Sequence, residues 1–256
     1  PPAAERMKKM QDQNRHYLAH EFFNEDWHPM HFSDVVGLLE GAKLEFAASA
    51  TYSDHVDNIN FTAEQRQFIS DIPDATLRET AKDFILNQQF RKDYWIKGAV
   101  RLAPLERAKA LRGLKVLLKI PASEITLKMT GGLGEVTFNE SVYQPIIDFL
   151  SDHQIRTLGE LEHHLEASGS DSGSRITLAQ IIQSVVLLLS TGQVALVQDA
   201  AVTNAVNTQS TALNGFLLDK AKYSNDVGYL ASPVTGGGVK ANRFEMLFLL
   251  AIAEGA

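Results

Sequence analysis

Residues 178–191 place the strongest constraint on how this 256-residue chain folds. They have the spacing of one helix, contain no charged side chain and carry apolar residues on nearly every side. A helix on the surface of a soluble protein normally keeps a polar face. We therefore expect this helix to be buried on more than one face, against another domain, a second subunit or the C-terminal helix.

The first half of the chain shows the spacing and capping residues of several helices. Thr62 and Gln65 form a capping-box pattern, and Asp74 precedes a helix whose apolar face extends to Phe90. Pro29 ends the helix expected at 14–24, and Ser33 is the expected N-cap of the next one. Short strands are expected at 43–50 and 91–99, so the predicted fold is mainly α with short β strands, an α+β fold.

The second half has a different order of elements, and we place a domain boundary near residue 120. Three expected helices are followed by a strand, which is the order of a winged-helix module. The chain is thus divided into a helical domain at 1–120 and a winged-helix-like domain at 121–256. The expected elements are strands at 116–118, 125–129 and 135–138, helices at 142–153, 157–167 and 178–191, a strand at 194–197, and helices at 210–223 and 243–253. A serine- and glycine-rich loop is expected at 168–174.

Composition argues against several classes of function. The formal charge is −7, which is unfavourable for binding a phosphate backbone. The third helix of the winged-helix pattern also lacks the Arg, Lys and Asn side chains of a DNA reader. No cysteine is present, which removes disulfides and thiolate chemistry and fits a cytoplasmic location. The longest apolar run, 181–189, is too short to span a bilayer.

Histidines are concentrated near the N-terminus. His16 and His20 share one helix face and could bind one ion, but closed structural zinc sites usually recruit cysteine as well, so we predict no metal site. His20, beside the carboxylate of Glu21, could act as a general base. The alternative is a buried polar pair that fixes two helices.

Two further motifs each allow two interpretations. Arg91 lies among aromatic residues at 90–95, which suits a nucleic-acid surface or, alternatively, an edge whose arginine pairs with an acid of the same domain. The glycines at 131–134 suit a phosphate loop or a hairpin turn. Because a strand-like segment rather than a helix follows them, we favour the turn.

Two segments carry a family resemblance. Residues 17–22 (Tyr-Leu-Ala-His-Glu-Phe) and 29–34 (Pro-Met-His-Phe-Ser-Asp) resemble the opening of the methyltransferase regulatory domain. Residues 90–99 resemble the arginine-rich strand near the end of that domain. In some bacterial methyltransferases this domain lies C-terminal to a class I S-adenosylmethionine-binding domain. The resemblance therefore implies the noncatalytic regulatory or substrate-presenting region of such an enzyme, of the protein lysine type.

The part that would bind S-adenosylmethionine is not visible in this sequence. No Gly-x-Gly lies between an apolar strand and a helix, and no strand–helix alternation of a doubly wound sheet occurs. We therefore assign no cofactor, catalytic residue or metal ligand to this chain. The resemblance implies S-adenosylmethionine for a missing N-terminal catalytic domain.

The expected partners are that S-adenosylmethionine-binding domain, in the same polypeptide or in trans, and a protein substrate. A stand-alone protein-interaction module is the alternative, and a nucleic-acid-binding winged helix is the third hypothesis. The residues chosen as candidate partner or substrate contacts are His20, Glu21, Trp27, Phe32 and Arg91.

Overall fold

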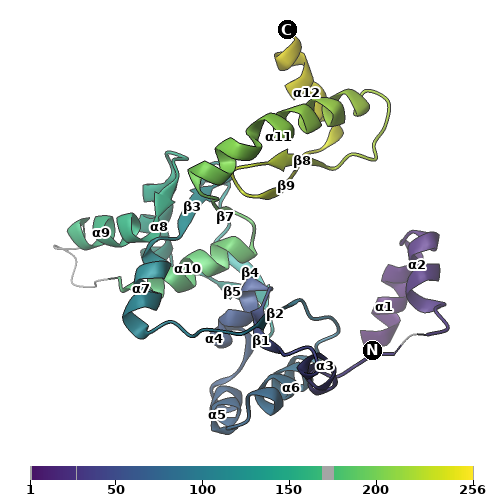
Figure 1. Cartoon of the computed structure of the whole chain (residues 1–256), viewed down its shortest axis with the longest axis vertical. Coiled ribbons are helices and arrows are strands. Elements are labelled where there is room, and N and C mark those ends of the chain that lie inside the picture. Colours follow the sequence, from purple (N-terminus) through teal and green to yellow (C-terminus); the bar gives the residue numbers. More distant parts are fainter. Residues whose placement is uncertain (1, 27, 169–175, 256) are drawn as a thin grey trace.

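The computed structural model describes residues 2–26, 28–168 and 176–255. Helices dominate and the strands form small antiparallel sheets, so the fold is mixed α+β, as predicted (Figure 1). In chain order the elements are α1 (Pro2–Gln11), α2 (Arg15–Phe22), α3 (Phe32–Glu40), β1 (Leu44–Ser49), the 3-10 turn η1 (Tyr52–His55), α4 (Asp57–Asn60), α5 (Ala63–Asp71), α6 (Ala75–Leu86), β2 (Asp93–Lys97), α7 (Pro104–Arg112), β3 (Lys115–Leu118), the 3-10 turn η2 (Ala122–Glu124), β4 (Lys128–Gly131), β5 (Gly134–Thr137), α8 (Glu140–Leu150), β6 (Arg156–Thr157), α9 (Leu158–Ser168), α10 (Leu178–Ser190), β7 (Val194–Leu196), α11 (Ala200–Lys220), β8 (Tyr229–Ser232), β9 (Gly237–Lys240) and α12 (Arg243–Glu254).

The N-terminal part is built on the antiparallel pair β1 and β2, in which Phe46 lies opposite Trp95. Helix α3 contacts both β1 and α6. The predicted capping box of α5 is confirmed, because Thr62 N donates to Gln65 Oε1 at 2.9 Å and Gln65 N donates to Thr62 Oγ1 at 3.3 Å. Asp74 caps α6 as expected.

Some expected boundaries are wrong. The N-cap of α3 is His31, two residues before the expected Ser33, because the Asp34 carboxylate accepts a hydrogen bond from His31 N at 3.0 Å. Helix α11 begins at Ala200, ten residues before the expected start. The hairpin of β8 and β9 was not expected, and the expected loop at 168–174 lies almost entirely outside the described residues.

The central part contains the main core. Helices α8, α9 and α10 pack with the antiparallel sheet β6–β3–β7, in which β3 is the middle strand. Ile181, Val185 and Leu188 of α10 are buried in this core, and Val56 and Ile59 join it from the N-terminal part. The prediction that α10 is buried on more than one face is therefore confirmed.

The turn between β4 and β5 packs closely against α4. Gly131 pairs with Gly134, so the glycine segment is a hairpin turn, as predicted. Gly132 N donates to Asn60 Oδ1 at 3.0 Å. A Cβ on Gly131 would lie 2.5 Å from the main-chain oxygen of Ile59, so only glycine allows this approach.

The C-terminal part projects from the body as an arm made of α11, the β8–β9 hairpin and α12 (Figure 1). Ala221, Ala241 and Met246 form its small core. The whole chain exposes 17611 Å². A compact monomer of 28.2 kDa would expose about 11,000 Å². The chain is therefore extended rather than compact.

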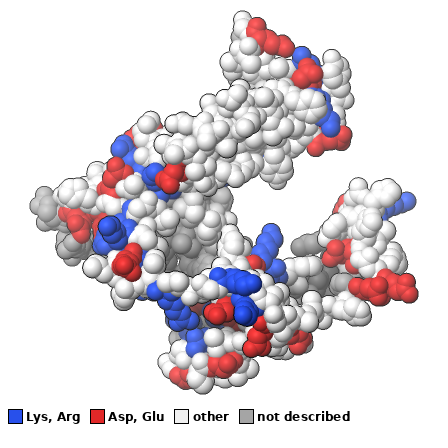
Figure 2. Space-filling model, in the orientation of Figure 1, with Lys and Arg blue, Asp and Glu red and all other residues white. Residues whose placement is uncertain are grey.

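The charge distribution differs between the body and the arm. In Figure 2, Lys, Arg, Asp and Glu gather over the lower body, while the face over α11 is almost free of them. Within the described ranges, no helix combines the length and apolar character needed to cross a membrane.

Candidate functional site

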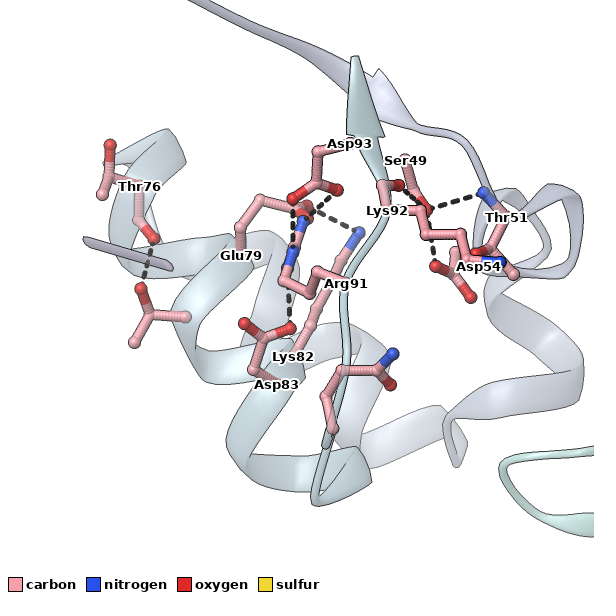
Figure 3. A network of polar contacts seen from close by, with 12 residues as sticks. Ser49, Thr51, Asp54, Thr76, Glu79, Lys82, Asp83, Arg91, Lys92 and Asp93 are labelled. Carbon is pink, nitrogen blue, oxygen red and sulfur yellow. Dashed lines mark hydrogen bonds and ion pairs between the residues drawn. The ribbon is translucent and has the colours of Figure 1, made fainter. Parts of the chain in front are cut away.

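Arg91 lies at the centre of an ion-pair network next to the first residue of β2. Its Nη1 donates to Asp83 Oδ1 at 2.6 Å and its Nη2 donates to Glu79 Oε2 at 3.0 Å, both on α6. Its Nε donates to Asp93 Oδ2 at 2.9 Å. Figure 3 shows the guanidinium held between the helix and the strand. We call these four residues the Arg91 cluster.

Aromatic rings close the cluster on another side. The guanidinium carbon of Arg91 lies 4.3 Å from the ring centre of Phe32, which is a cation–π geometry. Phe32 contacts Phe46 edge-on at 5.0 Å and stacks on Trp95 at 5.8 Å. Arg91 thus joins α3, α6 and β2 by hydrogen bonds and ring contacts together.

Burial sets the electrostatics of the cluster. It raises the pKa of the Asp83 carboxyl above its ordinary value, and Arg91 offsets this only in part. Burial alone lowers the pKa of Arg91, but hydrogen bonds to Asp93 and Glu79 and the charge of Asp83 raise it above its ordinary value. Arg91 is therefore a permanent cation shared by three carboxylates.

A pocket of about 190 Å³ lies beside the cluster. On its other wall, Ser49 Oγ donates to Asp54 Oδ2 at 2.6 Å, and His55 Nε2 lies 2.8 Å from the main-chain oxygen of Ser49. A serine nucleophile needs a base at its hydroxyl, whereas this hydroxyl is bound to a carboxylate and the imidazole is turned to the main chain. The arrangement suits a structural role of Ser49 in fastening η1 to β1.

The region around the Arg91 cluster matches a known protein family. Residues 14–97 match the family described as "Predicted methyltransferase regulatory domain". This segment, about a third of the chain, therefore matches a methyltransferase-associated regulatory domain. The matched range includes the Arg91 cluster and all the candidate contact residues.

Relatives extend the similarity over nearly the whole chain. A protein of Synechocystis sp. that is described as uncharacterised is 38% identical over 246 residues, which are 96% of this chain and 47% of the relative. The structure of PKMT2 from Rickettsia typhi in complex with AdoHcy is similar with a TM-score of 0.58 and 11% identity, over 96% of this chain and 51% of that chain. A second structure of PKMT2 gives a TM-score of 0.56, 11% identity and coverage of 95% and 51%. At this identity the likeness shows a shared fold, and the chain spans about half the length of these proteins.

Inside the regulatory domain, two of the candidate contact residues are engaged with their own domain. Phe32 is only 4% exposed and lies within the aromatic group. The Arg91 side chain is 19% exposed and paired with the three carboxylates. The alternative that Arg91 pairs with acids of its own domain is therefore confirmed. Sequence reasoning missed Glu79 and Asp83, although their spacing of four residues on α6 places them on one helix face.

The other candidates of the regulatory domain lie apart from the Arg91 cluster. His20 is exposed in the last turn of α2, so the interpretation as a buried polar pair is wrong. Glu21 is half-buried and lines a pocket of about 740 Å³ together with Tyr17, Met30 and Phe90. In the described part of the chain, neither residue forms an ion pair with Arg91.

The last candidate contact residue and the predicted absence of a metal site remain to be described. Trp27 lies outside the described residues. Across the described ranges, no group of three or more His, Cys, Asp or Glu side chains is placed to hold a metal ion.

Proposed function

We propose that this chain is the noncatalytic regulatory and substrate-presenting region of an S-adenosylmethionine-dependent methyltransferase, and that the catalytic domain is not part of it. The observation that carries this proposal is the match of residues 14–97 to the regulatory family. The coverage of only about half of each relative supports it, because the other half leaves room for a separate domain.

The sheets give a second line of support. A class I S-adenosylmethionine site lies at the carboxyl ends of strands in a parallel, doubly wound sheet. The sheets of the described residues are antiparallel and have two or three strands. We therefore assign S-adenosylmethionine to a partner domain, in the same polypeptide or in trans. AdoHcy in the PKMT2 complex fits this assignment.

The domain division is part of the same proposal. We propose a regulatory domain at 1–120 and a winged-helix-like domain at 121–256, with α8, α9 and α10 as its three helices. The middle strand β3 lies on the N-terminal side of residue 120 but pairs with β6 and β7, so a boundary just before Lys115 would keep this sheet in one domain. Since α10 is buried in the core, it is not free to enter a DNA groove, which keeps nucleic-acid binding in last place.

The contact surface would lie at the N-terminal end of the regulatory domain. His20, Glu21 and Trp27 are the proposed contacts with a partner or a protein substrate. Phe32 and Arg91 would hold this surface in place from within the domain, because their side chains are already engaged there. A chain without cysteine also fits the proposed cytoplasmic location.

Isothermal titration calorimetry with S-adenosylmethionine tests the proposal. The chain alone should give no binding heat, while the longer Synechocystis relative, which has the additional half, should bind. Saturable binding of one S-adenosylmethionine per chain by this chain alone would show that it holds a cofactor site of its own, and the proposal would be wrong.

The second candidate function is a stand-alone protein-interaction module, and the large exposed surface favours it. Phe23 and Phe90 are exposed aromatic residues near the N-terminal pocket and suit a test better than the buried Phe32. If this hypothesis is correct, Phe23→Ala and Phe90→Ala should abolish capture of a partner that lacks any methyltransferase domain, without changing the circular dichroism spectrum. Capture that requires an S-adenosylmethionine-binding domain would return the chain to the first proposal.

A further inference from the structure

Helix α11 has an incomplete environment. No residue from 200 to 218 is charged, and none of its residues is buried. An exposed helix normally carries charged or polar residues on the face that meets water, and α11 uses only uncharged Thr, Asn, Gln and Ser side chains there. Depletion of charge on an exposed face is instead typical of the centre of a binding interface.

One side of this helix forms a groove with the hairpin. The groove has a volume of about 630 Å³, and Val206, Leu213 and Leu217 form its helical wall. Tyr229 and Leu230 lie on the opposite wall. All the described residues that line it are uncharged. Its volume is within the range of about 300–1,000 Å³ that is typical of ligand sites.

The two walls are fastened to each other at both ends. Asn214 Nδ2 donates to the main-chain oxygen of Ala231 at 2.9 Å, and Ala231 N donates to Asn214 Oδ1 at 2.7 Å. At the other end, Gln198 N donates to the main-chain oxygen of Val234 at 2.8 Å. The groove is therefore preformed, which lowers the ordering cost of binding.

The dimensions of the groove suit an extended chain. The helical wall from Val202 to Leu217 is about 22 Å long, which an extended segment of about seven residues would span. Gly237 and Gly238 leave the main chain of β9 bare in the opposite wall, and a Cβ on Gly237 would have no atom within 4 Å. A strand-like ligand can approach bare main chain closely.

The lining also selects the chemistry of the ligand. A charged side chain placed in this groove would lose water without finding an opposite charge, which is unfavourable. Leu, Val, Thr, Ser and Asn side chains would meet apolar walls and the few hydroxyl and amide groups of the lining. We propose that the groove between α11 and the β8–β9 hairpin binds an extended, uncharged polypeptide segment.

The segment would belong to the protein that accepts the methyl group, and this assignment rests on the proposed function. Binding by the groove itself does not require it. A groove assay without S-adenosylmethionine therefore separates peptide binding from the proposed function. If the longer relative has no methyltransferase activity, peptide binding by the groove can still be detected. If the groove binds no peptide, the proposed regulatory role is not affected.

Fluorescence anisotropy of the whole chain with labelled peptides provides the test. One peptide of about ten residues alternates Val and Thr with Ser and Asn, and its counterpart carries Asp at every second position. We expect saturable binding of the uncharged peptide and at least about ten-fold weaker binding of the charged one.

Two variants of the same helix locate the binding. Leu213 lines the groove and is 49% exposed, whereas Phe216 lies outside it and is 66% exposed. Leu213→Asp should weaken peptide binding by at least about ten-fold, while Phe216→Asp should change it by less than about two-fold. Both residues are exposed, so both variants should keep the circular dichroism spectrum of the unmodified chain.

Three outcomes would overturn the proposal. The first is the absence of peptide binding up to about millimolar concentration. The second is equal weakening by both variants, which would indicate general stickiness of the helix. The third is a dimer in sedimentation experiments that Leu213→Asp converts to a monomer, because a second copy would then occupy the groove.

Discussion

Two helices of this chain lack charged residues over most of their length and differ in their surroundings. Helix α10 has no charged residue, and Ile181, Val185 and Leu188 are buried between the other helices, β7 and η1. Helix α11 has no charged residue from 200 to 218, yet none of its residues is buried. The N-terminal part covers the first helix, and nothing in the described chain covers the second to the same extent.

The difference shows what a charge-free helix does and does not specify. Helix α10 is mostly apolar, whereas α11 carries Thr, Asn, Gln and Ser along its length, and neither sequence states which element covers the helix. For α10 the protecting elements come from the same chain, through the core that Val56 and Ile59 share with it. For α11, nothing in the described chain covers the groove face, and we propose that a polypeptide ligand does so.

The largest expected effect tests this comparison directly. Leu188→Ala should lower the free energy of unfolding by about 2–5 kcal/mol, because Leu188 is 0% exposed and leaves a cavity in the core. Leu213→Ala should change it by about 0.5 kcal/mol or less, because Leu213 is exposed. Urea denaturation followed by circular dichroism measures both values.

The same pair of variants could contradict the difference in burial between α10 and α11. Similar losses for Leu188→Ala and Leu213→Ala would mean that α11 is covered in the chain in solution. The proposed groove would then be closed, and the arm would be folded against the body.

The second prediction concerns the Arg91 cluster, which stabilises the N-terminal part that covers α10. Arg91→Ala should lower the free energy of unfolding by about 3 kcal/mol, because it leaves Asp83 and Asp93 without their shared cation and Glu79 with Lys82 alone. Lys92→Ala is the matched control, since Lys92 is the exposed next residue.

Chemical denaturation compares these two variants. A change below about 1 kcal/mol for Arg91→Ala would place the cluster among weak surface ion pairs. The N-terminal part would then depend on its aromatic core instead.

The sequence predicted the elements whose signals are local. The capping patterns at Thr62 and Asp74 gave the starts of α5 and α6, and the charge-free character of 178–191 gave the burial of α10. The start of α11 was missed because Ala, Thr, Asn and Val alternate there without a clear apolar period. The β8–β9 hairpin was missed because its strands are short and rich in glycine.

The candidate site was predictable only in part, for a similar reason. Arg91 stood out in the sequence, and so did the possibility that it pairs with an acid of its own domain. Which acids it meets depends on how α6 packs beside β2, and this is a tertiary contact. The engagement of Phe32 with Trp95 depends on the same packing.

The third prediction addresses the joint between the N-terminal part and the core. Gly131→Ala should destabilise the chain by about 1–3 kcal/mol, because the new Cβ would lie 2.5 Å from the main-chain oxygen of Ile59 and main chain cannot easily move away. Gly37→Ala is the control, since that position is helical and has no atom within 4 Å of the added Cβ.

Differential scanning calorimetry separates the two glycine variants. Gly37→Ala should leave stability unchanged or raise it by about 0.5–1 kcal/mol. If Gly131→Ala behaves in the same way, the turn of β4 and β5 does not hold α4 tightly, and α10 is less firmly covered than the structure indicates.

The smallest effect is expected for Asp83→Asn, as a change in pH dependence. The folded state raises the pKa of Asp83 above its ordinary value of 3.8, so the folded state binds more protons than the unfolded state just above pH 3.8. Stability from this group therefore falls as pH rises from 3.8 through the folded pKa, and the loss is complete above it. Asn keeps an acceptor for Arg91 Nη1 but does not titrate, so this fall should disappear in the variant. We subtract the free energy of unfolding of the unmodified chain from that of Asp83→Asn at each pH. This difference should be larger at pH 7 than at pH 4, by about 1 kcal/mol or less. Urea denaturation across this range measures the difference, with the exposed Asp226→Asn as the control. A difference that is larger at pH 4 than at pH 7 would show that the attraction of Arg91 outweighs burial at Asp83. The Arg91 cluster would then stabilise the N-terminal part most strongly when all three carboxylates are charged.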